Sequence, residues 1–331
     1  MATTNGTAAN GTAHAAAAPT DMRAYRAPSL LQPFRARDAL RDAHEGKIPP
    51  LQVYFLMLSA PSIVKVIAQL GYDVILIDQE HSPMDISAMT QMAHDIQLIS
   101  EGKTMAWIRI CGHDHANIGY ALDTGASIMV PQVETVEDIK HIVSAAKFGK
   151  KINGTRSAPP GRWLPGVSDI GCDPEQTLWT NLNEQAAIII QVESKEAVDN
   201  LDDILTEAGK QIDAVWLGSL DCRVSMGLPG FWGEEPEFLA VLDTLNRTLR
   251  KHDMPYAGAA MGPPEQMAGM GQGKAFTAIQ GDVFSMVAAA QESLKQAREV
   301  LPAVNISAAN KKAREENKEM CSRWSQRRRR V

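Results

Sequence analysis

The sequence predicts an α/β protein, and more narrowly a (β/α)8 TIM barrel, from two observations. Eight short runs rich in apolar residues recur along the chain, and helical patterns separate them. Apolar runs without alternation are typical of strands that are buried on both faces of a parallel sheet. Strict alternation of eight strands with helices favours a closed barrel over an open doubly wound sheet.

The expected strands follow one another at similar spacing except at one place. They cover residues 52–58, 73–78, 105–110, 126–131, 187–192, 213–218, 256–260 and 276–281, the last two being the least apolar. Between the fourth and the fifth, residues 149–173 are rich in Gly, Pro, Arg and Trp. A long loop at the active face is more often a substrate lid, and a disordered excursion is the alternative.

Capping signals place helices between these strands. A Ser, Thr or Asp before a helical apolar pattern, sometimes with Pro next, is typical of a helix start. We therefore expect helices over 62–70, over 83–99 after Ser82 with Pro83 first, after Thr135 with Asp138 as its box partner, after Ser194, after Asp173 with Pro174 first, and over 235–252 and 283–300.

The chain is expected to have three parts. Residues 1–22 should be disordered because Ala, Thr, Asn and Gly bury too little surface to offset the entropy of ordering. Residues 23–303 should form a single barrel domain. Residues 304–331 form a basic tail with nine Lys or Arg against three Glu, so the tail is +6 and the rest of the −6 chain is −12. Such a run is more often a solvated tail, with nucleic-acid or partner binding as the alternative.

Composition excludes several classes of protein. No apolar stretch approaches the roughly 20 residues that span a bilayer, and no secretory signal opens the chain, so we expect a cytoplasmic protein without a membrane partner. The four Cys are scattered without a CxxC pair, which argues against a zinc or disulfide framework. The acidic body lacks interleaved aromatic and basic residues, which argues against nucleic-acid binding.

Polar residues of the kinds that catalysis uses follow four of the apolar runs. Asp78 and His81 follow the second run, Arg109 ends the third, and Glu193 and Asp221 follow the fifth and sixth. Carboxyl ends of barrel strands meet at one face, so these side chains should lie together. Two carboxylates suit Mg²⁺ or Mn²⁺, a histidine beside a carboxylate suits general base catalysis, and an arginine suits a carboxylate, enolate or phosphate.

Two further motifs are weaker candidates. His113-Asp114-His115 resembles a metal-binding pair, but it falls where a helix begins, which favours Asp114 as a cap with solvent-facing histidines. Gly269-Met-Gly-Gln-Gly273 follows a helical segment rather than a strand, so it lacks the context of a dinucleotide-binding loop.

These residues resemble those of the HpcH/HpaI family of class II pyruvate aldolases, in the phosphoenolpyruvate/pyruvate superfamily. The resemblance runs from about residue 35 to 300, and the extended N-terminus, the Pro-Pro-Gly-Arg-Trp loop and the basic tail resemble a fungal branch of the family. It rests on the order and spacing of the stretches 71–81, 108–109, 125–135, 191–194, 197–201, 218–221 and 225–227.

The resemblance implies a divalent-metal-dependent carbon-carbon lyase that acts on a 2-oxo acid by retro-aldol cleavage or oxaloacetate decarboxylation. Coupling of the enolate to a larger acceptor, such as a 2-pyrone, is a further option. It implies a homo-oligomer, commonly a hexamer built as a trimer of dimers, in which the last helix is exchanged. The implied roles are Mg²⁺, Mn²⁺ or Co²⁺ on Glu193 and Asp221, enolate stabilisation by Arg109, proton transfer by His81 oriented by Asp78, and substrate binding by Gln191, Ser219 and Leu220.

Two departures from the family leave the acceptor open. Gln79 stands where the family commonly has Gly, and Gly218-Ser-Leu-Asp221 replaces the usual Gly-Pro-Ala-Asp, which puts Leu220 next to an implied metal ligand. The alternatives are an acyl-CoA lyase of the same superfamily, or a non-catalytic scaffold whose basic tail binds nucleic acid or a partner.

Overall fold

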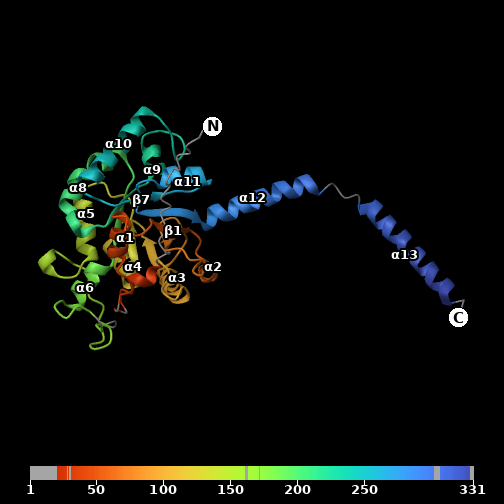
Figure 1. Cartoon of the computed structure of the whole chain (residues 1–331), viewed down its shortest axis with the longest axis horizontal. Coiled ribbons are helices and arrows are strands. Elements are labelled where there is room, and N and C mark those ends of the chain that lie inside the picture. Colours follow the sequence, from red (N-terminus) through yellow and green to blue (C-terminus); the bar gives the residue numbers. More distant parts are fainter. Residues whose placement is uncertain are drawn as a thin grey trace, which may run out of the picture. The chain divides into compact units, whose positions relative to one another are not determined.

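The chain folds around a closed barrel of eight parallel strands, with each strand paired to the next and β8 paired back to β1 (Figure 1). This confirms the predicted fold class. The described residues divide into two compact units, Met1–Val283, which contains the barrel, and Phe284–Val331. The computed structural model describes residues 21–27, 29, 31–160, 163–170, 172–301 and 306–328.

Strands form at all eight expected places, within a few residues of the predicted bounds. They are β1 (Leu51–Leu56), β2 (Val74–Asp78), β3 (Met105–Arg109), β4 (Ser127–Val130), β5 (Ile188–Val192), β6 (Ala214–Leu217), β7 (Tyr256–Ala259) and β8 (Phe276–Gly281). Every residue of β2, β3, β4 and β5 is buried, which explains why their sequences do not alternate.

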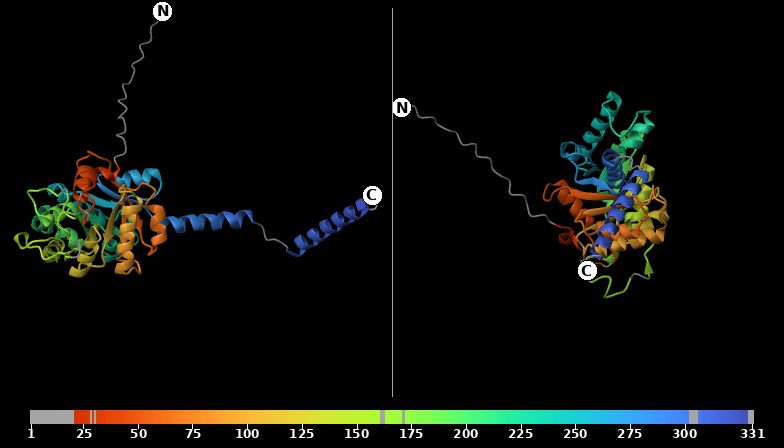
Figure 2. Two further views of the ribbon diagram at one scale, coloured as in Figure 1. Left: turned by 90° about the horizontal axis from the view of Figure 1, so that it is seen from below. Right: turned by 90° about the vertical axis from the view of Figure 1, so that its right-hand side faces the viewer.

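Helices cover the outside of the barrel, where α2 and α3 pack side by side (Figures 1 and 2). No described helix is both long and apolar enough to cross a membrane. The helices are α1 (Ala36–His44), α2 (Pro61–Ile67), α3 (Ile86–Ile99), α4 (His115–Asp123), α5 (Val136–Ala146), α6 (Leu178–Gln185), α7 (Lys195–Asp199), α8 (Leu201–Ala208), α9 (Ser219–Ser225), α10 (Pro236–Lys251), α11 (Pro264–Gly271), α12 (Asp282–Val300) and α13 (Ile306–Arg328).

Two predicted helix starts are wrong, and hydrogen bonding explains both. The Ser82 hydroxyl donates to the carbonyl of Met57, so Asp85 caps α3 instead, accepting from the Ala88 backbone N–H at 2.7 Å. Asp173 closes a local turn by accepting from the Glu175 backbone N–H at 2.9 Å. The extra helix, α6, therefore begins only after its cap Thr177.

The other predicted caps are confirmed. Thr135 and Asp138 form a reciprocal capping box at the start of α5, and Ser194 caps α7. The Asp114 side chain caps α4 by accepting from the Ala116 backbone N–H at 2.8 Å. Because these caps follow strand ends directly, they hold the loops that carry the functional side chains.

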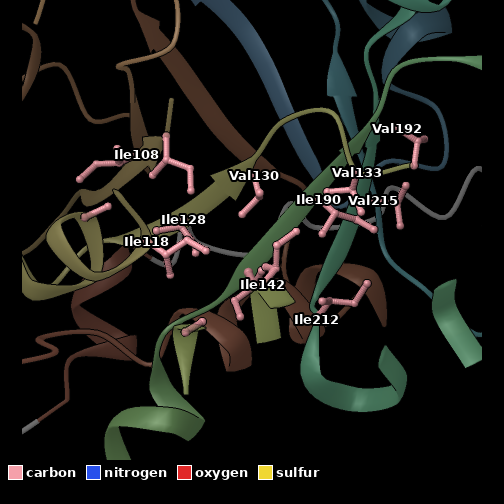
Figure 3. Close-up of a cluster of buried hydrophobic side chains, with 14 of the residues drawn as sticks. Ile108, Ile118, Ile128, Val130, Val133, Ile142, Ile190, Val192, Ile212 and Val215 are labelled. Atoms are coloured by element: carbon pink, nitrogen blue, oxygen red, sulfur yellow. The ribbon is translucent and has the colours of Figure 1, made fainter. Parts of the chain in front are cut away.

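The apolar core has two layers. One layer lies between the strands and the helices, and Figure 3 shows side chains of β3 to β6 gathered there with Ile118 of α4 and Ile142 of α5. The other fills the barrel, where the rings of Trp107 and Phe276 lie 5.0 Å apart. A filled barrel has no open pore, so a ligand must bind at its end.

The amino-terminal segment joins the inner layer. Met22, the last residue of the segment expected to be disordered, is buried with Tyr25 and Phe34 against the barrel core. Residues 1–20 lie outside the described residues, as do Gly161 and Arg162 of the long loop and residues 329–331 of the basic tail.

Candidate active site

The candidate site lies at the carboxyl ends of the strands. Asp78 ends β2 and Arg109 ends β3, and the two are partners in the strand register. Gln191 lies in β5, and Glu193 follows that strand directly. Asp221 lies in the first turn of α9, just after the neighbouring strand β6. The barrel therefore brings these residues to one end, as parallel strands require.

Arg109 is held rigidly by Asp78. Its Nε and Nη2 donate to Asp78 Oδ1 and Oδ2 at 2.8 and 2.7 Å, and both side chains are buried. The guanidinium lies 5.0 Å from the centre of the Phe55 ring, a cation-π contact. Although burial works against its charge, the hydrogen bonds that it donates to Asp78 keep the pKa of Arg109 above its ordinary value. The site thus has a fixed, permanent cation.

Glu80 is a residue that the sequence analysis missed. Its Oε2 lies 3.3 Å from Arg109 Nη1 and 3.7 Å from His81 Nε2, and burial raises its pKa. Asp78 accepts hydrogen bonds from the backbone N–H groups of Glu80 and His81, at 3.1 and 3.4 Å. Asp78 therefore positions the backbone of this loop, and the carboxylate beside the imidazole belongs to Glu80. The position of Glu80 between Asp78 and His81 in the sequence could have indicated that it belongs to the site.

Glu193 is a buried carboxylate that lies directly over the backbone of Gly218. Its Oε2 accepts from the Gln132 backbone N–H at 2.8 Å, and Gln132 adopts a left-handed backbone, with φ of 54°. A Cβ atom at position 218 would lie 2.4 Å from Glu193 Oε1. Burial raises the pKa of Glu193 to about 7, with Glu80 and Asp221 adding to the effect. Neither Gln132 nor Gly218 was predicted as a site residue.

A cavity of about 540 Å³ contains both predicted metal ligands. Of the remaining predicted residues, Ser219 is buried and Leu220 half-buried at the start of α9, next to Asp221. The cavity is lined by His113, Gln132, Glu134, Thr135, Asp138, Glu193, Ser194, Asp221, Val224 and Ser225.

The donor set fits a hard divalent cation. Glu193 and Asp221 supply carboxylate oxygens, which Mg²⁺ and Mn²⁺ prefer. The buried Oε1 of Gln191 has no hydrogen-bond partner among the described residues, so it is free to receive one from a ligand. Within the part of the chain that the structure describes, no three His, Cys, Asp or Glu residues are arranged to hold a metal. A cation here would rest on two carboxylates and leave positions for water and substrate.

The fold is a (β/α)8 barrel with acidic side chains and an arginine at the carboxyl ends of its strands, an arrangement that aldolases and lyases use. The chain belongs to the HpcH/HpaI aldolase/citrate lyase family, whose model matches residues 51–289. It is thus a carbon-carbon lyase of the class II pyruvate aldolase kind.

Individual relatives agree with this membership. The chain is 28% identical over 260 residues to a 2-keto-3-deoxy-L-rhamnonate aldolase of Escherichia coli strain UMN026, covering 77% of this chain and 89% of the relative. It is 34% identical over 187 residues to a 4-hydroxy-2-oxovalerate aldolase of Novosphingobium aromaticivorans, covering 55% and 65%. Macrophomate synthase has a similar structure, with a TM-score of 0.74, 28% identity, and coverage of 83% of this chain and 93% of that one.

Proposed function

We propose that this protein is a divalent-metal-dependent lyase that cleaves a carbon-carbon bond in a 2-oxo acid. The observation that carries the proposal is the pairing of Glu193 with Asp221 in one cavity, at the ends of neighbouring strands. The substrate would be a 4-hydroxy-2-oxo acid, which gives pyruvate and an aldehyde, or oxaloacetate, which gives pyruvate and CO₂. Both reactions pass through the enolate of pyruvate.

Glu193 and Asp221 would hold Mg²⁺, or alternatively Mn²⁺ or Co²⁺. A metal bound there would act as a Lewis acid that offsets the negative charge developing on the keto oxygen. Gly218 supports this role because its missing side chain leaves room for the Glu193 carboxylate. The Gln132 backbone N–H orients the same carboxylate.

The 2-oxo acid half of the substrate would bind between Arg109 and Gln191. Arg109 is fixed by Asp78, so its charge is already oriented before the enolate forms, and such preorganised charge is the usual source of stabilisation. Gln191 has an unpartnered buried oxygen, and its amide would position the bound acid. Ser219 and Leu220 would form the adjoining wall.

His81 would handle the proton. In aldol cleavage His81 would take the proton of the hydroxyl on carbon 4. The bond between carbons 3 and 4 would then break, and the electron pair of that bond would form the enolate. Protonation of carbon 3 then gives pyruvate, and the aldehyde leaves. Glu80 Oε2 lies 3.7 Å from Nε2 of His81, close to where this proton would be held. Loss of CO₂ from oxaloacetate leaves the same enolate without a hydroxyl proton to remove.

We also propose that the active form is a homo-oligomer, with a hexamer built as a trimer of dimers as the family expectation. Asp282 is the one buried residue among the described residues of α12, and from Phe284 on the helix belongs to the second compact unit. Four large apolar side chains on this helix are about half exposed, namely Phe284, Met286, Val287 and Leu294. An exposed apolar helix is typical of an interface with another subunit.

The lyase proposal is tested by measuring pyruvate release from oxaloacetate with Mg²⁺ and with EDTA. We expect EDTA to abolish turnover and added Mg²⁺ to restore it. Glu193→Ala should lose turnover while the protein remains folded by circular dichroism, and Glu265→Ala, on the outer helix α11, should retain it. Turnover that persists in EDTA, or that survives Glu193→Ala, would falsify the proposal.

A further inference from the structure

The cavity that contains Glu193 and Asp221 has a second wall that the 2-oxo acid does not use. His113 comes from the loop between β3 and α4, while Glu134 and Asp138 come from the start of α5 and the loop before it. Val224 is the apolar side chain in the lining, and the other residues are polar or charged. The second half of a substrate would meet a hydrogen-bonding surface.

The backbone at His113 is tied to α5, which carries His141. The Nε2 atom of His141 lies 2.9 Å from the His113 carbonyl oxygen, and the two rings lie 6.5 Å apart. His113 is half-buried, which corrects the expectation that both histidines of this motif face solvent, while His115 is exposed. Asp114 can therefore cap α4 while its neighbour His113 lines the cavity.

Asp138 carries a fixed negative charge near His113. Its Oδ2 accepts from the backbone N–H groups of Glu134 and Thr135, at 3.2 and 2.9 Å, because it closes the capping box of α5. Burial raises its pKa, but these hydrogen bonds, that of the Thr135 hydroxyl and the nearby charge of His113 leave it below its ordinary value. Asp138 therefore stays ionised and adds negative charge to the cavity wall.

We propose that His113, whose backbone is held by His141 and which shares the cavity wall with Asp138, binds the aldehyde-side fragment and selects a neutral, hydroxyl-bearing aldehyde. This inference rests on the proposed lyase function and assigns the second half of the same site. The imidazole, carboxylate and Ser225 hydroxyl groups of this wall can form hydrogen bonds with the hydroxyls of a fragment. An apolar fragment, such as a 2-pyrone ring, would leave these polar groups without hydrogen-bond partners. Glu134 and Asp138 disfavour an anionic fragment by repulsion.

The test compares His113→Ala and His113→Gln with the parent protein on three substrates. One is a 4-hydroxy-2-oxo acid with a further hydroxyl on the aldehyde side, the second is its deoxy analogue, and the third is oxaloacetate, which has no aldehyde fragment. We expect kcat/KM for the hydroxylated substrate to fall about 10- to 100-fold in His113→Ala, with a smaller loss in His113→Gln. The loss on the deoxy analogue and on oxaloacetate should stay below about threefold.

His115→Ala is the matched control because His115 is exposed two residues away and is absent from the cavity lining. It should match the parent protein on all three substrates. Equal losses on all three in His113→Ala, or no loss on any, would overturn the inference while leaving the lyase function intact. A parent protein that prefers the deoxy analogue would overturn it too. Absence of turnover of every substrate with Mg²⁺ would instead overturn the lyase function.

Discussion

Two buried carboxylates, one at each end of the barrel, have different hydrogen-bonding surroundings. At the amino-terminal end, Asp213 Oδ1 accepts from Arg37 Nε at 2.7 Å, and Oδ2 accepts from the Ile188 backbone N–H at 2.8 Å. At the carboxyl-terminal end, Glu193 makes one hydrogen bond, to a backbone N–H, and burial raises its pKa to about 7. Asp213 has an internal partner for each oxygen, whereas only Oε2 of Glu193 has a hydrogen-bond partner among the described residues, and its Oε1 lies against Gly218.

This difference distinguishes a carboxylate that supports the fold from one that is available to a ligand. A buried polar group without a partner costs about 1 to 3 kcal/mol of stability, so folding alone does not favour it. Glu193 and the unpartnered oxygen of Gln191 lie together at the mouth of the barrel. Under the proposed function a ligand would complete the arrangement, which is the usual reason why binding sites give up stability.

The largest expected effect separates Asp221 at the mouth from Asp213 at the other end. In Asp221→Ala, turnover of the 2-oxo acid should fall about 10³-fold, because the proposed metal would lose one of its two carboxylates. The free energy of unfolding should change by less than about 0.5 kcal/mol, because Asp221 is exposed and in this structure supports no other element. Steady-state kinetics and urea unfolding of the same preparation measure the two effects. A variant that retains activity would remove Asp221 from the site.

Asp213→Ala should show the reverse pattern. It breaks the pair with Arg37, whose side chain is only 15% exposed, and leaves the Ile188 N–H without its acceptor. Losing one partner of a buried ion pair costs about 3 to 5 kcal/mol. Thermal unfolding should therefore shift strongly, while kcat/KM of the folded fraction stays within about twofold of the parent protein. Asp38→Ala, on the exposed face of α1, is the control, and a comparable loss of stability there would refute the explanation.

Features of the strands could be predicted from the sequence, whereas features of the loops could not. The strands were predictable because every residue of β2 to β5 is buried, and burial leaves a non-alternating apolar run. The gathering of Arg109, Glu193 and Asp221 was predictable too, because parallel strands end on one face. Neither result depends on the conformation of a particular loop.

The missed residues all depend on loop conformation. Glu80 reaches Arg109 only because Asp78 holds the backbone of the following loop, and Gln132 reaches Glu193 only through a left-handed backbone. His113, which the sequence analysis named but expected to face solvent, lines the cavity because its loop packs against α5. Local propensity does not encode such contacts, which are set by partners distant in the sequence.

A substitution at Gly218 should have a smaller effect, and it tests the position of the Glu193 carboxylate. Its φ of −73° is available to any residue, so close approach, and not backbone freedom, explains the glycine. In Gly218→Ala the new methyl group would meet Glu193 Oε1 and Cγ, at 2.4 and 2.7 Å, and the carboxylate must move. We expect turnover to fall about 10- to 100-fold, since small misplacement of a catalytic group has this effect.

The apparent affinity for Mg²⁺, measured by titrating turnover, should weaken in the same variant. Gly119→Ala on α4, where a Cβ would meet nothing within 4 Å, is the matched control and should behave like the parent protein. Unchanged Mg²⁺ affinity in Gly218→Ala would show that the carboxylate has room that the contacts do not indicate.

The smallest effect concerns Lys147 at the amino-terminal end. Its ammonium group is buried, donates to the Asn183 carbonyl oxygen, and has its pKa lowered to about 8 by burial. Between about pH 8 and its ordinary pKa of 10.5, the folded chain binds fewer protons than the unfolded chain, so this group makes stability rise with pH.

Compared with Lys147→Met, which cannot titrate, the parent protein should gain about 1 kcal/mol of unfolding free energy per pH unit across that window. Below about pH 8 both states are protonated, so the difference between the two proteins should become independent of pH. Urea unfolding at half-unit steps from pH 7 to 10 measures this difference, in which the other titrating groups cancel. If the difference in unfolding free energy between the two proteins does not change with pH, the buried amine keeps its ordinary pKa. The amino-terminal end of the barrel would then tolerate a buried charge.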